Sequence, residues 1–260
     1  GDEVGALKTA TDLAIGVMRA CNSVTTEGSI WEVDPALRPE GKQGALVRTI
    51  ESHLDYYERW AKTWEFQALL KARPSAGDLE LGARYVDAVA PFVWSAADHD
   101  GFVTDVQAMR RRVEEQVPAR IGERELKLGP GGLRDVEFSV QLLQLVHGRS
   151  DVMLRSSTTL DALEALAVWG YVGRDDASTL ADAYRFLRTL EHRLQLHKLR
   201  RTHTMPEDES DLRRLGRSLG YRGDPVGELH AKWRTHAREV RRLHEKLFYR
   251  PLLQAVARLD

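Results

Sequence analysis

Cysteine is almost absent from this chain. Cys21 is the single one among 260 residues, so no internal disulfide can form, and a reducing compartment such as the cytoplasm is expected. Because Cys21 falls on the apolar stripe of the first expected helix, we expect a buried structural thiol there. Long apolar runs are missing as well. No stretch approaches the eighteen residues that a membrane-spanning helix needs, and no signal-like segment opens the sequence, so no membrane partner is expected.

An excess of positive charge is also lacking. The 38 Lys and Arg residues are balanced by 39 Asp and Glu residues, which gives a formal net charge of −1. Nucleic-acid-binding domains usually carry a basic stripe or patch, so this balance argues against a nucleic-acid partner. An initiating Met is missing too, and we expect an excised piece of a longer protein.

Helical periodicity is what the sequence does contain. Apolar residues recur every three to four positions in nine segments, which predicts a mainly α-helical fold. The segments are residues 6–21, 52–71, 79–89, 102–117, 135–147, 158–169, 177–199, 207–219 and 227–259, the last with a break expected near Pro251.

Two short stretches predict strands instead. Residues 29–34, "SIWEVD", alternate in polarity and are closed by Pro35, and residues 123–129, "ERELKLG", predict a second, brief strand. A sheet of one or two strands is not stable alone in water. The first strand is therefore expected to need partners beyond those in this chain.

Asp34 stands at the end of the first expected strand, four residues before Arg38. A carboxylate in this position, with an arginine nearby, can hold a divalent cation beside a nucleotide phosphate. The alternative is an Asp that caps a turn and pairs with Arg38. One carboxylate does not make a magnesium site, so spacing alone leaves both interpretations open.

The segment "KLGPGGLRDVEF" places three glycines and a proline directly before a charged helix start. Backbone amides of such a turn, together with the helix N-terminus, can bind an anion. The residues predicted to bind a phosphate or nucleotide here are Lys127, Gly131, Gly132 and Arg134. Asp135 and Glu137 would repel a phosphate, so we interpret them as supporting or metal-side groups. The alternative is a tight turn followed by acids that the helix dipole favours.

Glu191 lies close to the apolar stripe of the segment "LEHRLQLHKLRRTH". A buried carboxylate must be paired, and Arg188 or Arg134 is the expected partner. His192 and His197 are five residues apart, so they do not share a helix face as metal ligands four apart would. We therefore interpret Glu191 as a supporting group rather than as part of a metal site.

Four motifs in order resemble a known family. They are "WEVDPALRPEGKQGALV", "YYERWAKTWEFQALLKAR", "KLGPGGLRDVEFSVQLLQLVHG" and "LRTLEHRLQL". Together they resemble the bifunctional glutamine synthetase adenylyltransferase/adenylyl-removing enzymes over nearly the whole chain. The sequences of these motifs are more similar to the N-terminal, adenylyl-removing unit than to the C-terminal one, and they suggest an actinobacterial source.

The resemblance implies a fold and a chemistry. It implies a partial polymerase-beta-like nucleotidyltransferase palm over residues 1–50, with a few short strands, followed by a helical bundle over residues 51–260. Such palms use Mg²⁺ and three carboxylates. Asp34 matches the third, catalytic and metal-binding, carboxylate, whereas the first pair has no match in this chain. We therefore expect this chain to be essentially inactive alone.

The implied reaction is phosphorolysis of adenylyl-tyrosine on glutamine synthetase, which releases ADP. The expected partners are glutamine synthetase, the PII signal protein, and phosphate, ADP or ATP, and glutamine as small ligands. Two alternatives remain: the adenylyl-transferring unit of the same enzyme, and a non-catalytic helical regulatory or protein-interaction domain.

Overall fold

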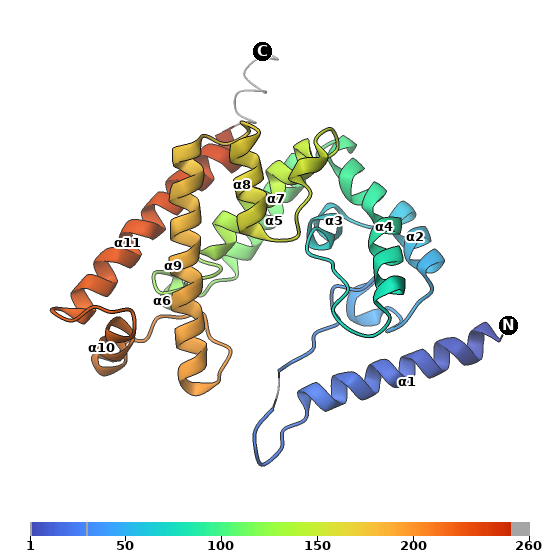
Figure 1. The fold of residues 1–260 in the computed structure, drawn as a ribbon, viewed down its shortest axis with the longest axis horizontal. Helices are drawn as coiled ribbons and strands as arrows, with labels where there is room; N and C mark the ends of the chain where they lie inside the picture. Colours follow the sequence, from blue (N-terminus) through green and yellow to red (C-terminus); the bar gives the residue numbers. More distant parts are fainter. Residues whose placement is uncertain (1, 30, 251–260) are drawn as a thin grey trace. The chain divides into compact units, whose positions relative to one another are not determined.

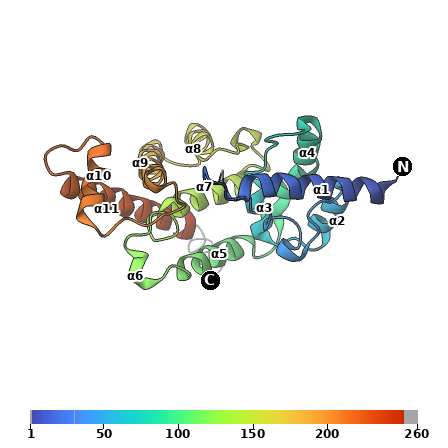
Figure 2. The ribbon, with the colours of Figure 1, turned by 90° about the horizontal axis from the view of Figure 1, so that it is seen from below.

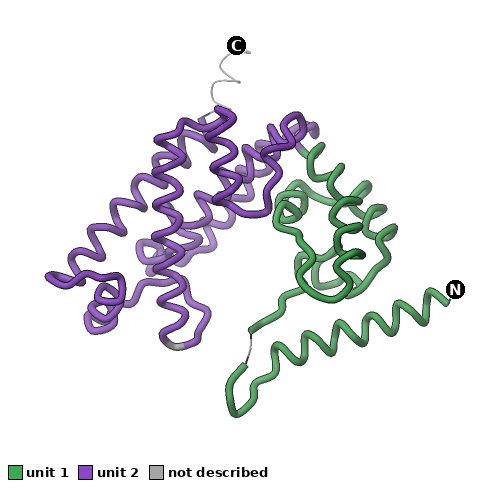
Figure 3. Tube along the Cα trace, viewed as in Figure 1, with its two compact units in different colours: residues 1–96 green, residues 97–260 purple. Residues whose placement is uncertain are grey.

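A computed structural model describes residues 2–29 and 31–250 of the chain. Its described part consists of helices joined by turns (Figure 1), which confirms the prediction of a mainly α-helical protein. The chain divides into two compact units, residues 1–96 and residues 97–260 (Figure 3). In the part of the chain that the structure describes, no helix is long and apolar enough to cross a membrane.

The first unit contains four α-helices: α1 (Glu3–Asn22), α2 (Ile50–Arg59), α3 (Thr63–Leu69) and α4 (Leu79–Ser95). A short 3-10 turn, η1 (Gly41–Gln43), precedes α2, and a second, η2 (Ala96–Asp98), follows α4. Helix α4 packs against α2 and α3. The apolar side chains buried in this unit are Tyr57, Phe66, Leu70, Val89, Val93 and Ala96.

Two expectations for the first unit are wrong. Cys21 is only half-buried, because α1 has no buried residue to pack around it. The single helix expected over residues 52–71 is two helices, since the chain leaves helical geometry after Arg59 and α3 starts anew at Thr63. The backbone amide of Lys62 donates to Glu65 Oε1 at 3.0 Å, which stabilises the new helix start.

The strand expected over residues 29–34 is not found. Residues 31–34 have no regular structure, and residue 30 lies outside the described residues. Across the described ranges, β-structure is limited to two isolated bridges, Thr25 with Gly28 and Glu125 with Thr204. A lone strand leaves its backbone groups unpaired, so the alternating sequence does not form one here. The partial palm is therefore not confirmed, and its boundary at residue 50 stays a prediction.

The second unit is a helical bundle. It contains α5 (Phe102–Glu115), α6 (Ala119–Gly122), α7 (Leu133–His147), η3 (Val152–Leu154), α8 (Thr159–Val168), α9 (Arg174–Lys198), α10 (Glu209–Ser218) and α11 (Pro225–His244). Figure 2 shows α7 among α8, α9 and α11, which all pack against it. Most of α7 is buried, so this helix is the centre of the bundle.

Local sequence explains where the later helices begin. Asp208 accepts hydrogen bonds from the first amides of α10, and Asp224 accepts one from Gly227 in α11, which has Pro225 at its first position. Helix α11 passes at His244 into one π-helical turn, η4 (Glu245–Tyr249). The break expected near Pro251 lies outside the described residues.

The brief strand expected over residues 123–129 is reduced to a single bridge that still matters for the site. The Leu126 amide donates to the carbonyl of His203 at 2.8 Å, and the Met205 amide donates to the carbonyl of Arg124 at 2.9 Å. These two bonds join the segment before α7 to the segment after α9. They place Lys127 beside His203.

Candidate functional site

Asp34 is exposed, and its carboxylate caps a turn. Its Oδ1 accepts a hydrogen bond from the Ala36 amide at 3.0 Å. The Arg38 guanidinium donates to backbone carbonyls, at 2.9 Å to Pro35 and at 2.9 Å to Gly44. The structure thus uses Arg38 to hold the loop, and its carbonyl contacts replace the pairing with Asp34 that the alternative expected.

The ligand set of the predicted magnesium ion is incomplete among the described residues. Within residues 2–29 and 31–250, no group of three His, Cys, Asp or Glu side chains is placed to hold a metal ion. Asp34 supplies one exposed carboxylate, whereas Mg²⁺ takes six oxygen ligands, which usually include one or two carboxylates, several waters and substrate phosphate. The described residues alone do not fit a magnesium site.

The glycine turn before α7 is shaped by close packing. Gly131 has a φ of 73°, and a Cβ added there would lie 2.2 Å from the carbonyl oxygen of Ala237 in α11. A Cβ on Gly132 would lie 2.8 Å from the Leu126 carbonyl oxygen. Both positions require glycine because backbone atoms fill the space that a side chain would need.

The amides of this turn are already bonded within the chain. Gly131 donates to Asp135 Oδ2 at 2.7 Å, and Gly132 donates to the Gly129 carbonyl at 3.1 Å. The amides of Leu133 and Arg134 each donate at 2.9 Å to carbonyls of the preceding segment. The donors that the sequence predicts for a phosphate are thus used internally, and phosphate binding by Gly131 and Gly132 stays a prediction.

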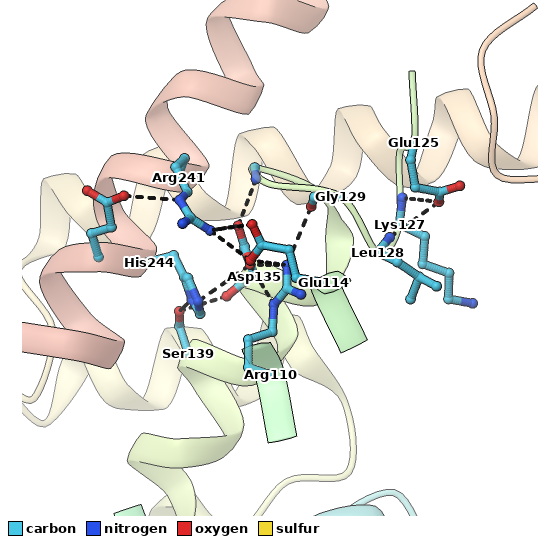
Figure 4. A network of polar contacts seen from close by, with 12 residues as sticks. Arg110, Glu114, Glu125, Lys127, Leu128, Gly129, Asp135, Ser139, Arg241 and His244 are labelled. Atoms are coloured by element: carbon cyan, nitrogen blue, oxygen red, sulfur yellow. Dashed lines mark hydrogen bonds and ion pairs between the residues drawn. The ribbon is translucent and has the colours of Figure 1, made fainter. Parts of the chain in front are cut away.

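Asp135 is fully buried and lies at the centre of a polar network (Figure 4). Arg110 of α5 donates from Nε to Asp135 Oδ1 at 2.8 Å, and both side chains are 0% exposed. Ser139 donates to the Asp135 carbonyl at 2.7 Å and lies 2.8 Å from His244 Nδ1. Arg241 approaches the other carboxylate oxygen at 3.7 Å. The network joins α5, α7 and α11.

His244 remains uncharged within this network. Burial lowers the pKa of His244 to about 4, helped by the positive charges of Arg110 and Arg241, although Asp135 acts in the opposite direction. His244 Nε2 lies 3.4 Å from Asp135 Oδ1 without the alignment of a hydrogen bond. Asp135 is therefore balanced by arginine, and its role in the structure is to tie three helices together.

A second buried carboxylate, Glu191 of α9, gathers basic groups around it. Its side chain is 2% exposed; Arg188 Nη1 lies 2.7 Å from Oε2 and Lys127 Nζ lies 3.9 Å from Oε1. His203 Nδ1 is 2.8 Å from Oε1, a close contact that is not aligned as a hydrogen bond. The prediction that Glu191 must be paired is confirmed, with Arg188 as the partner.

The pKa of Glu191 reflects these neighbours. Burial alone would raise it, but the contacts with His203 and Arg188 and the positive charge of Lys127 lower it to about 2. Glu191 is therefore ionised. Burial, together with the charges of Arg134 and Arg188, lowers the pKa of Lys127, against the effect of Glu191 and Glu137.

Glu137 of α7 lies in the same region. Its Oε2 accepts from Arg134 at 2.9 Å, and its Oε1 accepts from the Tyr184 hydroxyl at 3.1 Å. The Arg188 guanidinium lies 5.5 Å from the centre of the Tyr184 ring. Tyr184 thereby links the Glu137 pair to the Glu191 pair.

We call this set the cationic cluster: Lys127, Arg134, Arg188 and His203 around Glu137 and Glu191. The three permanent cations outnumber the two carboxylates by one. The acids lie inside, at 10% and 2% exposure, whereas the Lys127, Arg134 and Arg188 side chains are 21%, 36% and 37% exposed. Cationic side chains that buried carboxylates hold in place, and that remain open to solvent, can bind an anion.

The structure separates what the sequence grouped together. Lys127 and Arg134 join Glu137 and Glu191 in the cationic cluster, whereas Asp135 belongs to the buried network; Figure 4 shows the Lys127 side chain directed away from Asp135. Gly131 and Gly132 instead line a cavity of about 690 Å³ with Trp233 and His230 of α11.

Several residues of the cationic cluster and of the network around Asp135 were not predicted from the sequence. Tyr184 stands seven residues before Glu191, two helical turns away on the same face, and this spacing is a signal that could have found it. His203 contacts Glu191 from the segment after α9, and no sequence spacing indicates this contact. Arg110 and His244 lie far from Asp135 in the sequence, and no spacing indicates them.

The comparisons with known proteins agree over the whole chain. Residues 107–248 match the family described as GlnD PII-uridylyltransferase, and residues 2–88 match the family described as glutamate-ammonia ligase adenylyltransferase. Proteins named bifunctional glutamine synthetase adenylyltransferase/adenylyl-removing enzyme are similar throughout. The relative from Streptomyces coelicolor is 69% identical over 99% of this chain and 26% of its own length. Those from Nocardia farcinica and Mycolicibacterium smegmatis are 61% and 57% identical over 97% and 96% of this chain, and 25% of each relative. The chain thus spans about a quarter of the length of these relatives.

Proposed function

The chain belongs to the family of bifunctional glutamine synthetase adenylyltransferase/adenylyl-removing enzymes, and from this premise we propose that it is part of the adenylyl-removing unit. Its residues 107–248 belong to the domain family described as GlnD PII-uridylyltransferase. In the proposed reaction, an oxygen of inorganic phosphate attacks the phosphorus of adenylyl-tyrosine on glutamine synthetase. The bond to the tyrosine oxygen breaks, ADP is released, and the tyrosine oxygen takes up a proton.

The observation that carries this proposal is the surplus positive charge of the cationic cluster. Lys127, Arg134 and Arg188 are held in place by carboxylates that are themselves buried. An incoming phosphate would meet preorganised cations that need little rearrangement, which is the arrangement that phosphate-binding sites use. We assign phosphate binding to these three residues and their positioning to Glu137 and Glu191.

The wider partners are part of the same proposal for the whole protein. Glutamine synthetase is the proposed protein substrate, PII a proposed protein partner, and ADP, ATP and glutamine are proposed small ligands. Neither a membrane nor a nucleic acid is a proposed partner, and the cytoplasm is the proposed location. Asp34 is proposed as one Mg²⁺ ligand and Arg38 as a nucleotide contact. The remaining ligands of that ion are not found among the described residues.

Two experiments test the catalytic assignment. Asp34→Ala in the full-length protein that contains this chain is expected to abolish deadenylylation and leave the fold intact. The isolated 260-residue chain is expected to release essentially no ADP from adenylylated glutamine synthetase and phosphate. Release at a rate near that of the full-length enzyme would show that the other metal ligands are not needed.

A third experiment tests the cationic cluster through phosphate use. Arg188→Gln and Arg134→Gln in the full-length protein are expected to raise the KM for phosphate about tenfold or more, since each removes a charge-assisted contact, and Arg188→Lys should recover part of it. The matched control is Arg193→Gln, which changes an exposed arginine on the same helix. If the KM for phosphate is the same in all of these variants, the cluster does not bind phosphate.

The same experiments address the two alternatives. Normal deadenylylation in Asp34→Ala, Lys127→Ala and Arg134→Ala together would favour a non-catalytic helical interaction domain. Unchanged deadenylylation with a loss of adenylyl transfer would assign the chain to the transferring unit.

A further inference from the structure

The first unit contains a cavity of its own, of about 710 Å³. It is bordered by the start of α2, by the loop before α4 and by the first turns of α4. Gly82 in α4 faces this loop, because a Cβ there would lie 2.5 Å from Pro74 Cβ. The volume falls in the range of small-molecule sites in proteins.

One side of this cavity is positively charged. Its lining includes the arginines Arg48, Arg73 and Arg84, against the two carboxylates Glu51 and Asp78. Asp78 is engaged at the start of α4, where its Oδ1 accepts a hydrogen bond from the Leu81 amide at 2.9 Å. Arg48 Nη2 forms an ion pair with Glu40, so Arg73 and Arg84 bring the positive charge that an anionic ligand would meet in this cavity.

Two buried polar atoms at the cavity lack a partner. Among the described residues, Arg48 Nε and His53 Nδ1 have no hydrogen-bond partner although both atoms are shielded from solvent. Leaving such an atom unsatisfied is costly, and it often indicates a missing ligand or water. Burial lowers the pKa of His53, and the positive charge of the neighbouring Arg48 lowers it further; an anion in the cavity would offset that charge.

Helix α2 reinforces this polarity. Its first residue, Ile50, lines the cavity, so the helix starts there with its amides and the positive end of its dipole. The lining also includes apolar groups of α4: Leu81, Val86 and the ring of Tyr85, which meets His53 edge to face at 5.1 Å between ring centres. A bare inorganic ion would leave these apolar groups and most of the volume unused.

We propose that the cavity between α2, α4 and the loop at residues 72–76 binds a phosphorylated small molecule with an apolar or aromatic body. The phosphate lies against Arg73, Arg84, the unpartnered Nε of Arg48 and the start of α2, and the body lies against Tyr85, Leu81 and Val86. This site belongs to the first unit and does not depend on the cationic cluster.

The test uses the whole 260-residue chain carrying Arg188→Gln, so that the cationic cluster is weakened as a competing anion site. Isothermal titration calorimetry compares phenyl phosphate, inorganic phosphate and malonate. We expect phenyl phosphate to bind most tightly, because it alone fills both the charged and the apolar parts. The His53 ring signals in NMR spectra should shift during its titration.

Variants then locate the binding. Arg84→Gln and Arg73→Gln change exposed residues that border the cavity, and they are expected to weaken phenyl phosphate binding about tenfold or more. Arg59→Gln changes an exposed arginine at the far end of α2 and should leave binding unchanged. The proposal is overturned if phenyl phosphate does not bind, if malonate or inorganic phosphate binds as tightly, or if Arg59→Gln weakens binding as much as the cavity variants.

Discussion

Gly131 and Ala237 are in backbone contact: a Cβ on Gly131 would lie 2.2 Å from the Ala237 carbonyl oxygen. This approach joins the turn before α7 to the middle of α11, and it explains the glycine without a ligand. It also allows the Gly131 amide to donate to Asp135 at 2.7 Å, so one residue serves both packing and the buried network.

Gly131→Ala is expected to destabilise the fold by roughly 2–5 kcal/mol, because the positive φ and the clash with Ala237 add together. Gly170→Ala is the matched control. Gly170 also has a positive φ, 81°, but open space around its Cβ position, so only the backbone cost of about 1 kcal/mol applies. Urea unfolding of both variants measures the difference. Equal losses would mean that the contact with α11 is unimportant.

Asp135→Asn is expected to destabilise the chain by roughly 3–5 kcal/mol. The substitution keeps the shape of the side chain but leaves the buried Arg110 with only the more distant Glu114, at 3.7 Å, as a counter-charge. Arg242→Gln, in which a surface ion pair with Glu239 is lost, is the control and should cost about 1 kcal/mol or less. A similar free energy of unfolding for the two variants would contradict the importance of burial.

His244 should resist protonation in the folded chain. Its pKa is lowered to about 4 from an ordinary value near 6.5, so the unfolded state takes up the proton first. Its contribution to stability is full above about pH 6.5 and is lost as the pH falls toward 4. An NMR titration of the His244 ring measures the midpoint directly, and a midpoint at the ordinary value would contradict this expectation.

Glu191 gives a second pH dependence, at lower pH. Its folded pKa of about 2 lies below its unfolded value of 4.5, so the ionised carboxylate stabilises the fold above about pH 4.5. That contribution, on the order of 2–3 kcal/mol, disappears as the pH falls toward 2. The stability advantage of the parent chain over Glu191→Gln should therefore shrink across this range in urea unfolding experiments. A constant difference would show that the charge of Glu191 is not what its neighbours stabilise.

Local sequence was sufficient for most of the helices and for one pairing in the cationic cluster. Apolar spacing indicated the segments that became α4, α5 and α7 to α11, because burying one helix face gives a period that the sequence must carry. The apolar surroundings of Glu191 required a cation, and Arg188 three residues earlier was in reach. The alternation in residues 29–34 failed to predict structure because a strand depends on partners that local pattern does not specify.

A helical protein with a single cysteine, no net basic charge and a glycine turn before a charged helix can be predicted from the sequence. What that turn does depends on contacts with distant parts of the chain. The Gly131 amide donates to Asp135, and Arg110 of α5 and His244 of α11 lie next to the same carboxylate. The segment that predicted a phosphate-binding turn therefore binds a carboxylate of its own helix instead. Contacts across 25 and 109 residues of sequence arise from packing, and no local spacing can encode them.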